Sequence, residues 1–305
     1  MKHLQFQIKR AWALWDEFWF APQNLLGLAF MRVVLCGTLF YMSFMRFFNM
    51  WFFTDASWVT KEKSLLILPE IGRPMWDWNF WSDAYNVPIN ILVVILFALL
   101  TLGIGGRILM LLAWVINIGF IYRNYPVHFG ADVIASLFLF YMSFTNSCER
   151  LSVLNLIRKK KSFKPSDALS SMMIRMMQVQ IIAIYAYTGW EKLKGASWWD
   201  GTAMWSVLAN PQMTTVDFSF LRDFPWILPI IGYMTIIFEV YFPPMVIWHK
   251  SRHVWLLMGF VMHMGIGLFM GLMPFATIML STYFLFLSPI ALEQKVVSKL
   301  DFSKN

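Results

Sequence analysis

One lysine and two histidines stand out as residues whose types and positions suit acid–base chemistry. Lys192 directly follows an apolar stretch, His263 lies inside another, and His128 precedes a third. A lysine in a partly apolar site can lose its proton and then act as a base, with histidines orienting its substrate. The alternatives are structural: a lysine that extends to lipid headgroups, and histidines that hydrogen-bond between helices.

Two further charged residues, Arg32 and Glu239, lie within apolar stretches. Burying an ionisable side chain in hydrocarbon costs at least about 2.5–3.5 kcal/mol on insertion scales, so such residues are usually paired or functional. Both lie at similar depth from the same side. We therefore expect a structural Arg32–Glu239 ion pair, in which each side chain offsets the burial of the other.

Metal or nucleotide chemistry is not indicated. His249 and His253 are spaced i,i+4 as helical metal ligands can be, but they lie in a basic segment without neighbouring carboxylates or thiolates. Cys36 and Cys148 fall in an apolar stretch and near a basic loop, so we expect no disulfide. The sequence has no Gly-x-Ser-x-Gly elbow, phosphate loop or dinucleotide fingerprint.

The composition determines the class of protein that carries these residues. Of 305 residues, 59% are apolar and 14% are charged, against roughly 45–50% and about 25% in soluble proteins. This excludes a disordered chain, a soluble nucleic-acid binder and a disulfide-built secreted module. The net charge of +8 is instead typical of membrane proteins with basic cytoplasmic loops. We predict an all-α polytopic membrane protein.

The apolar pattern predicts about eight transmembrane helices in one bundle, some of them short for a crossing that needs about 20 residues. The predicted spans are residues 25–47, 89–103, 107–122, 131–144, 172–190, 226–248, 254–271 and 274–289. Pro88 suits the start of the second span, and Pro274 separates the last two.

Charge predicts the orientation of these spans. If successive spans cross the membrane in opposite directions, the basic clusters at residues 158–164 and 250–252 lie on the same face of the membrane. The long connections 48–88 and 191–225 then lie on the other face, and they hold more acids than bases. Basic loops stay in the cytoplasm. We therefore expect both chain ends to be cytoplasmic, in a bacterial inner membrane, and Lys192 to face outward.

The two ends of the chain flank the predicted bundle of residues 25–290. In residues 1–24 the apolar side chains recur every three or four residues opposite basic ones, which predicts an amphipathic helix lying in the membrane interface; packing on the bundle is the alternative. Residues 291–305 are a predicted cytoplasmic tail. The apolar positions of the first helix are Leu4, Ile8, Trp12, Trp15 and Trp19.

The two long outer connections are rich in tryptophan, which prefers the boundary between water and lipid. Interface anchoring explains most of these residues, and a subset could line a cavity for an aromatic or lipid-like ligand. They are Trp51, Trp58, Trp76, Trp78 and Trp81 in the first connection, and Trp198, Trp199 and Trp205 in the second.

Segment 187–193, Tyr-Thr-Gly-Trp-Glu-Lys-Leu, followed by Trp198, Trp199 and Gly201, resembles the outer-face motif of HTTM-domain proteins. That family includes the vitamin K-dependent γ-glutamyl carboxylases and bacterial relatives. The segment from His263 to residue 289 continues the resemblance, and Asn124 with the His128 stretch is a weaker match. The resemblance covers essentially the whole chain.

This resemblance implies a function and a site. Lys192 would be the base that deprotonates a reduced naphthoquinone, with His128 and His263 beside it. Oxygen would convert the quinone to an epoxide and so generate the strong base for glutamate carboxylation. Membrane lipid, a lipid quinone and an exported peptide are the implied partners, without nucleic acid or metal. The predicted substrate-binding residues are Tyr187, Trp190, Trp198 and Trp199.

The chain also departs from the carboxylases. No β-rich lumenal domain follows the bundle, and Glu191 stands where the animal enzymes have a second lysine. Glu191 could pair with Lys192 and keep it protonated. Two other functions therefore stay open: a non-catalytic membrane partner that binds or matures a small exported peptide, and a lipid or small-molecule transporter.

Overall fold

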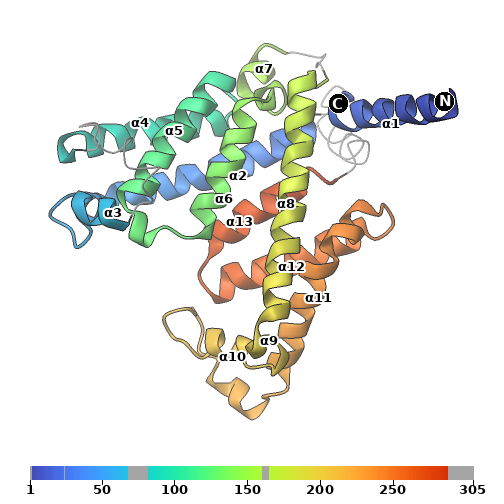
Figure 1. The fold of residues 1–305 in the computed structure, drawn as a ribbon. Helices are drawn as coiled ribbons and strands as arrows, with labels where there is room; N and C mark the ends of the chain where they lie inside the picture. Colours follow the sequence, from blue (N-terminus) through green and yellow to red (C-terminus); the bar gives the residue numbers. More distant parts are fainter. Residues whose placement is uncertain (1, 24, 68–81, 160–164, 288–305) are drawn as a thin grey trace, which may run out of the picture. The chain divides into compact units, whose positions relative to one another are not determined.

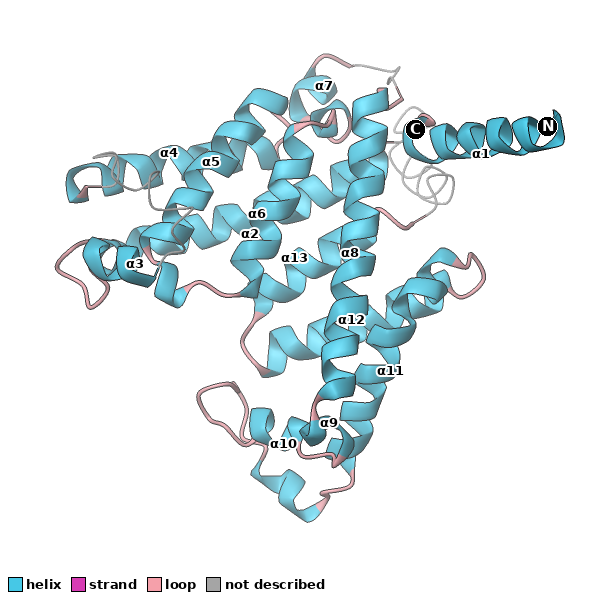
Figure 2. Ribbon diagram, in the orientation of Figure 1, coloured by secondary structure: helices cyan, strands magenta, loops and turns pink. Residues whose placement is uncertain are grey.

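The computed structural model describes residues 2–23, 25–67, 82–159 and 165–287, and throughout these ranges it is built from helices and loops without a strand (Figures 1 and 2). The predicted all-α class is confirmed. Trp76, Trp78 and Trp81, most of the 158–164 basic cluster and the predicted tail lie outside the described residues.

The helices differ widely in length. The long ones are α1 (Lys2–Phe20), α2 (Leu26–Phe48), α4 (Asp83–Thr101), α5 (Arg107–Arg123), α6 (Gly130–Ser143), α8 (Ala168–Lys194), α11 (Ile227–Ile247), α12 (Arg252–Phe269) and α13 (Met273–Tyr283). The short ones are α3 (Lys61–Ile67), α7 (Val153–Ile157), α9 (Ala196–Trp199) and α10 (Ala203–Leu208), with 3₁₀ turns η1 (Met50–Phe53), η4 (Tyr125–Val127), η5 (Ser147–Glu149) and η6 (Ser219–Asp223).

Every predicted span coincides with a helix, but the spans differ in how well they suit a membrane. Five helices in the described ranges, α2, α4, α8, α11 and α12, are long and apolar enough to cross one. The other three, α5, α6 and α13, have 17, 14 and 11 residues. The count of eight therefore stays a prediction. Because α4 begins at Asp83, Pro88 lies in its second turn rather than at its start.

The chain divides into two compact units, Met1–Arg175 and Met176–Ala291, with the boundary inside α8. In the first unit α2 packs against α4, α4 against α5, and α5 against α6 (Figure 1). In the second, α11 packs against α12 and α12 against α13. The predicted domain boundaries at residues 24 and 290 are not tested by this division.

Arg32 holds the first unit together from inside. Its side chain is completely buried on α2, and its guanidinium donates to the carbonyl oxygens of Ser147, Arg150 and Leu151 at 2.8, 3.2 and 2.6 Å. The expected Arg32–Glu239 ion pair is therefore wrong, since Arg32 has carbonyl partners in its own unit. A planar guanidinium can donate hydrogen bonds to several carbonyl oxygens at once. A chain segment with several free carbonyl groups therefore satisfies its N–H groups better than one carboxylate does.

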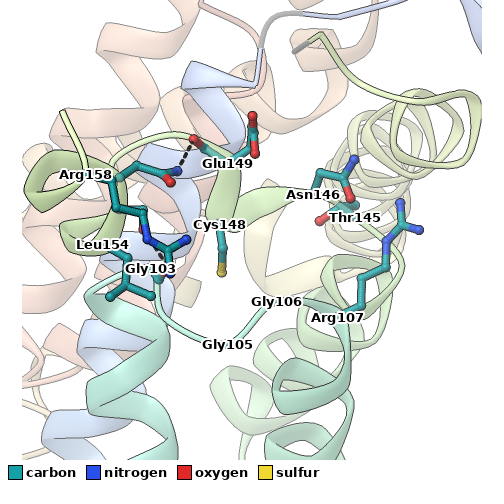
Figure 3. A pocket seen from close by; sticks show the side chains of 12 residues that line it. Gly103, Gly105, Gly106, Arg107, Thr145, Asn146, Cys148, Glu149, Leu154 and Arg158 are labelled. Atoms are coloured by element: carbon teal, nitrogen blue, oxygen red, sulfur yellow. Dashed lines mark hydrogen bonds between the residues drawn. The ribbon is translucent and has the colours of Figure 1, made fainter. Parts of the chain in front are cut away.

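The segment that Arg32 holds also forms one wall of a pocket. The Ser152 hydroxyl donates to the Gly103 carbonyl at 2.8 Å, which fastens this segment to the turn between α4 and α5. The turn, the η5 segment and α7 surround a polar cavity of about 350 Å³, in which Arg107 and Arg158 lie on opposite sides (Figure 3). Arg107 is already engaged by Asp167 at 2.5 Å.

Helix α1 exposes bulky apolar side chains, among them Phe6, Trp12 and Trp15, together with Lys9 and Arg10. The Phe18 carbonyl accepts a hydrogen bond from Arg175 at 3.0 Å, which ties the end of α1 to the start of α8. Exposed apolar and basic residues on one helix are what an interfacial helix requires. The interfacial placement of α1 stays a prediction.

Replacing Arg32 with leucine should abolish folding of the first unit. The change leaves three carbonyl groups without their donor, and hydrogen bonds to charged groups each contribute about 1.5–3 kcal/mol. Their combined loss is comparable to a total stability of about 5–15 kcal/mol. We expect little monodisperse protein by size-exclusion chromatography, whereas the exposed Arg10→Leu control should match wild type. Normal yield of Arg32→Leu would show that these hydrogen bonds are dispensable.

Candidate functional site

Lys192 and Glu239 form an ion pair in the second unit. The Lys192 Nζ lies 2.7 Å from Glu239 Oε2, with Lys192 near the end of α8 and Glu239 in the middle of α11. The Lys192 side chain is 21% exposed and that of Glu239 only 9%. The lysine predicted as the base thus has a buried carboxylate as its direct partner, while its own side chain remains partly exposed.

The two side chains meet because the helix backbones touch one turn earlier. A Cβ atom at Gly189 would lie only 2.9 Å from the backbone nitrogen of Val240 and 3.1 Å from the Glu239 carbonyl carbon. Glycine is thus required at this crossing. In α11, Pro243 and Pro244 lack the N–H groups that would bond to the carbonyls of Glu239 and Val240. The helix is therefore weakened where it approaches α8.

Trp198 completes the surroundings of Lys192. Its ring centre lies 5.2 Å from the Lys192 Nζ, within the range of a cation–π contact. Backbone hydrogen bonds fix the neighbouring tryptophan, because the Trp199 indole donates to the Leu193 carbonyl and the Tyr233 hydroxyl donates to the Trp199 carbonyl. The short helix α9 is held against both α8 and α11.

The other charged group of this motif has a separate partner. Glu191 pairs with Lys194 at 2.7 Å, and both side chains are about half exposed. The suggestion that Glu191 pairs with Lys192 is therefore wrong. Spacing explains the choice, since residues three apart on a helix are neighbours and adjacent residues are not.

The predicted substrate-binding residues differ in their placement. Trp198 lies beside Lys192 and Trp199 is bound to the backbone, as described above. Tyr187 and Trp190 are 66% and 59% exposed, and Trp190 contacts Lys194 rather than Lys192. Only Trp198 therefore contacts the predicted base directly, and binding of a substrate by the four residues stays a prediction.

His263 belongs to a buried hydrogen-bonded chain in the second unit. Its Nε2 lies 2.6 Å from the Tyr185 hydroxyl, which in turn lies 2.6 Å from the Tyr283 hydroxyl. All three side chains are buried, and Phe238 and Phe242 pack against Tyr185. This chain joins α8, α12 and α13 through polar contacts inside an apolar core.

The two tyrosines of this chain were not predicted as site residues. Tyr185 precedes Lys192 by seven residues, or two helical turns, so both lie on the same face of α8, as does Gly189 between them. This spacing was the available signal. The spacing alone did not mark Tyr185 as a site residue, because an aromatic residue in an apolar span usually packs in the hydrophobic core.

His128 belongs to the first unit. Its Nδ1 hydrogen-bonds to the Tyr125 carbonyl, and its ring stacks on Tyr125 at a centre distance of 4.3 Å. It also lines a small cavity with Arg46, Asn124 and Asp132. Lys192 and His263 belong to one unit and His128 to the other, and the expected convergence of the three groups stays a prediction.

The part of the chain that the structure describes contains no group of three or more His, Cys, Asp or Glu side chains arranged to hold a metal ion. The chemistry that the Lys192 site can support is proton transfer. An ammonium and a carboxylate in an apolar surrounding can take up one proton from a bound hydroxyl and hold the resulting anion.

The family model of the HTTM domain matches residues 85–290. This range includes both units' candidate residues from His128 to His263, and it excludes α1, α2 and α3. Neither the curated proteins nor the solved structures contain a match to this chain.

Gly259→Ala should disrupt the buried chain around His263. A Cβ at this position of α12 would lie 2.1 Å from the Tyr283 hydroxyl oxygen and 2.7 Å from the Phe238 ring. Overpacking of this kind costs about 1–3 kcal/mol. We expect a lower midpoint of thermal unfolding, measured on protein in lipid discs.

Gly265→Ala on the same helix is the matched control, because its Cβ would meet only Phe269, at 3.9 Å. An alanine there should leave the midpoint unchanged or raise it, since alanine favours a helix over glycine by up to about 1 kcal/mol. Equal effects of the two substitutions would contradict the packing described around Tyr283.

Proposed function

Because the chain belongs to the HTTM-domain family, we propose that it is a membrane enzyme that takes a proton from a reduced lipid quinone at the Lys192–Glu239 pair. The five apolar helices fit a membrane-integral protein. We place it in a bacterial inner membrane, with both ends in the cytoplasm and Lys192 outside. The activated quinone would serve the modification of an exported peptide, in the manner of the carboxylases that the motif resembles.

The observation that carries this proposal is the geometry of the pair. Either charge alone, on Lys192 or on Glu239, would be strongly disfavoured in this buried position. As an ion pair 2.7 Å apart, the two side chains have no net charge. The lysine is the more exposed of the two. A ligand therefore reaches the lysine side chain more readily than the carboxylate, which would serve as the proton acceptor behind it.

Proton transfer at such a pair balances simply. A hydroxyl of the hydroquinone hydrogen-bonds to Lys192 and gives up its proton to the pair, so that Glu239 ends as the neutral acid. Lys192 remains an ammonium and binds the new phenolate oxygen by charge and hydrogen bonding. The phenolate then reacts with oxygen. In the overall reaction, hydroquinone and O₂ give quinone epoxide and water.

The residues around the pair support an aromatic substrate. The Trp198 ring beside Lys192 offers a flat apolar face to a quinone ring, and its contact with the ammonium keeps that group in place. The His263–Tyr185–Tyr283 chain, with Tyr185 bonded to both other residues, fixes α8 against α12 and α13. We assign His263 and the tyrosines to positioning rather than to contact with the substrate.

A cavity elsewhere in the second unit favours one second function. Helix α10 and its connection to α11 line an open pocket of about 470 Å³, with Trp205, Phe218 and the charged Asp217 and Arg222 in its wall. Its volume is within the range of small-ligand sites. A side chain or a short stretch of an exported peptide could bind there, as a non-catalytic membrane partner would require.

Epoxide formation tests the enzyme proposal. Purified protein in lipid discs would receive reduced naphthoquinone and oxygen, and mass spectrometry would measure quinone epoxide. We expect wild type to form epoxide and Lys192→Ala to lose at least about a hundredfold in rate, the lower range for a positioned acid–base group.

Two further variants separate chemistry from folding. Lys192→Gln keeps a hydrogen-bond donor for Glu239 and should also be inactive, whereas Lys194→Ala removes an exposed lysine two residues away and should retain full activity. Comparable elution of all variants on size-exclusion chromatography would establish folding. Absence of epoxide with folded wild type would reject the enzyme proposal and favour the peptide partner.

A further inference from the structure

A second polar site lies in the first unit, around Arg46 near the end of α2. The Nη1 atom of Arg46 is buried and has no hydrogen-bond partner. In the described residues no carboxylate lies within 4.0 Å of this guanidinium, although five other Arg or Lys side chains do form such pairs. A buried donor on a cation normally has a partner, so its absence needs a cause.

Two phenyl rings hold the Arg46 guanidinium in place. Its central carbon lies 4.3 Å from the ring centre of Phe120 and 5.4 Å from that of Phe53. Aromatic faces stabilise a guanidinium without using its N–H groups, because those point outward in its plane. The arginine is thus positioned while one of its donor atoms stays free.

The unpartnered donor borders a small cavity of about 80 Å³. Asn124 lines the same cavity, and its Oδ1 is a buried acceptor without a partner. A cavity needs only about 10–15 Å³ to hold a single water, so this one has room for a molecule of several heavy atoms. A cationic donor and a neutral acceptor therefore border the same small cavity, which is open on one side.

Two other polar side chains, those of Asp132 and His128, line the same cavity. The Asp132 carboxylate accepts a hydrogen bond from the Phe129 amide at 3.1 Å at the start of α6 and is attracted electrostatically to Arg46 without a direct contact. The His128 Nδ1 bonds to the Tyr125 carbonyl and so carries the proton in the neutral ring, which leaves Nε2 as an acceptor. A complementary ligand needs an oxyanion for Arg46 and a hydroxyl for Asn124 or His128.

We propose that this cavity binds a small oxyanion that also carries a hydroxyl group, of which hydrogen carbonate is the representative. The oxyanion accepts from Arg46, and the hydroxyl donates to Asn124. The proposal concerns the first unit alone and does not depend on any activity of Lys192.

The test uses the full chain in lipid discs and ¹³C-labelled hydrogen carbonate at mildly alkaline pH. Binding broadens the hydrogen carbonate signal in the NMR spectrum. Arg46→Gln should weaken binding at least about tenfold, the effect of losing one hydrogen bond to a charged group. Arg10→Gln on α1 removes the same charge from an exposed position and should bind as wild type does.

A second variant tests the hydroxyl contact. Asn124→Leu removes the acceptor, so it should weaken hydrogen carbonate more than formate, which has no hydroxyl to donate. All variants would be compared at matched thermal unfolding midpoints. No broadening with wild type would mean that the cavity holds only water, and broadening that survives Arg46→Gln would place the ion elsewhere; either result overturns the proposal.

Discussion

A charged side chain inside an apolar helix must find its counter-groups within the protein, and this constraint organises both units. Arg32 satisfies it with three carbonyl oxygens of one connecting segment, which fastens that segment to the turn after α4. Lys192 and Glu239 satisfy it with each other, which joins α8 to α11. In each case a polar contact selects one arrangement among apolar surfaces that would otherwise pack in many ways. The Lys192–Glu239 site therefore also stabilises the packing of α8 against α11.

The helices could be predicted from the sequence because hydropathy and helix breaks are local properties. All eight predicted spans coincide with helices, and the largest difference in their starts is at α4, where Pro88 is accommodated inside the helix. Partners could not be predicted in the same way. Arg32 and Glu239 are at similar depths, but depth does not give the direction in which a side chain leaves its helix. That direction depends on which backbones approach, and the approach at Gly189 brings Glu239 to Lys192.

The same reasoning explains which site residues were found. Lys192 and His263 stand out by type, since few titratable groups occur in the spans. Tyr185 and Tyr283 have no charge and resemble packing residues, yet they connect His263 to α8 and α13. Arg46 was missed because an arginine at the end of a span resembles an interface anchor. Its distinguishing feature, a buried donor without a partner, exists only in the folded structure.

A double-mutant cycle on Lys192 and Glu239 tests the central claim most directly, with stability measured by denaturant unfolding in micelles. Lys192→Met and Glu239→Gln would be made singly and together. If the pair is the joint between α8 and α11, Lys192→Met should cost about 3–5 kcal/mol by leaving a buried carboxylate unpaired. The double variant should recover most of that loss. Additive effects, with coupling below about 0.5 kcal/mol, would contradict the account, since the two side chains would then act independently.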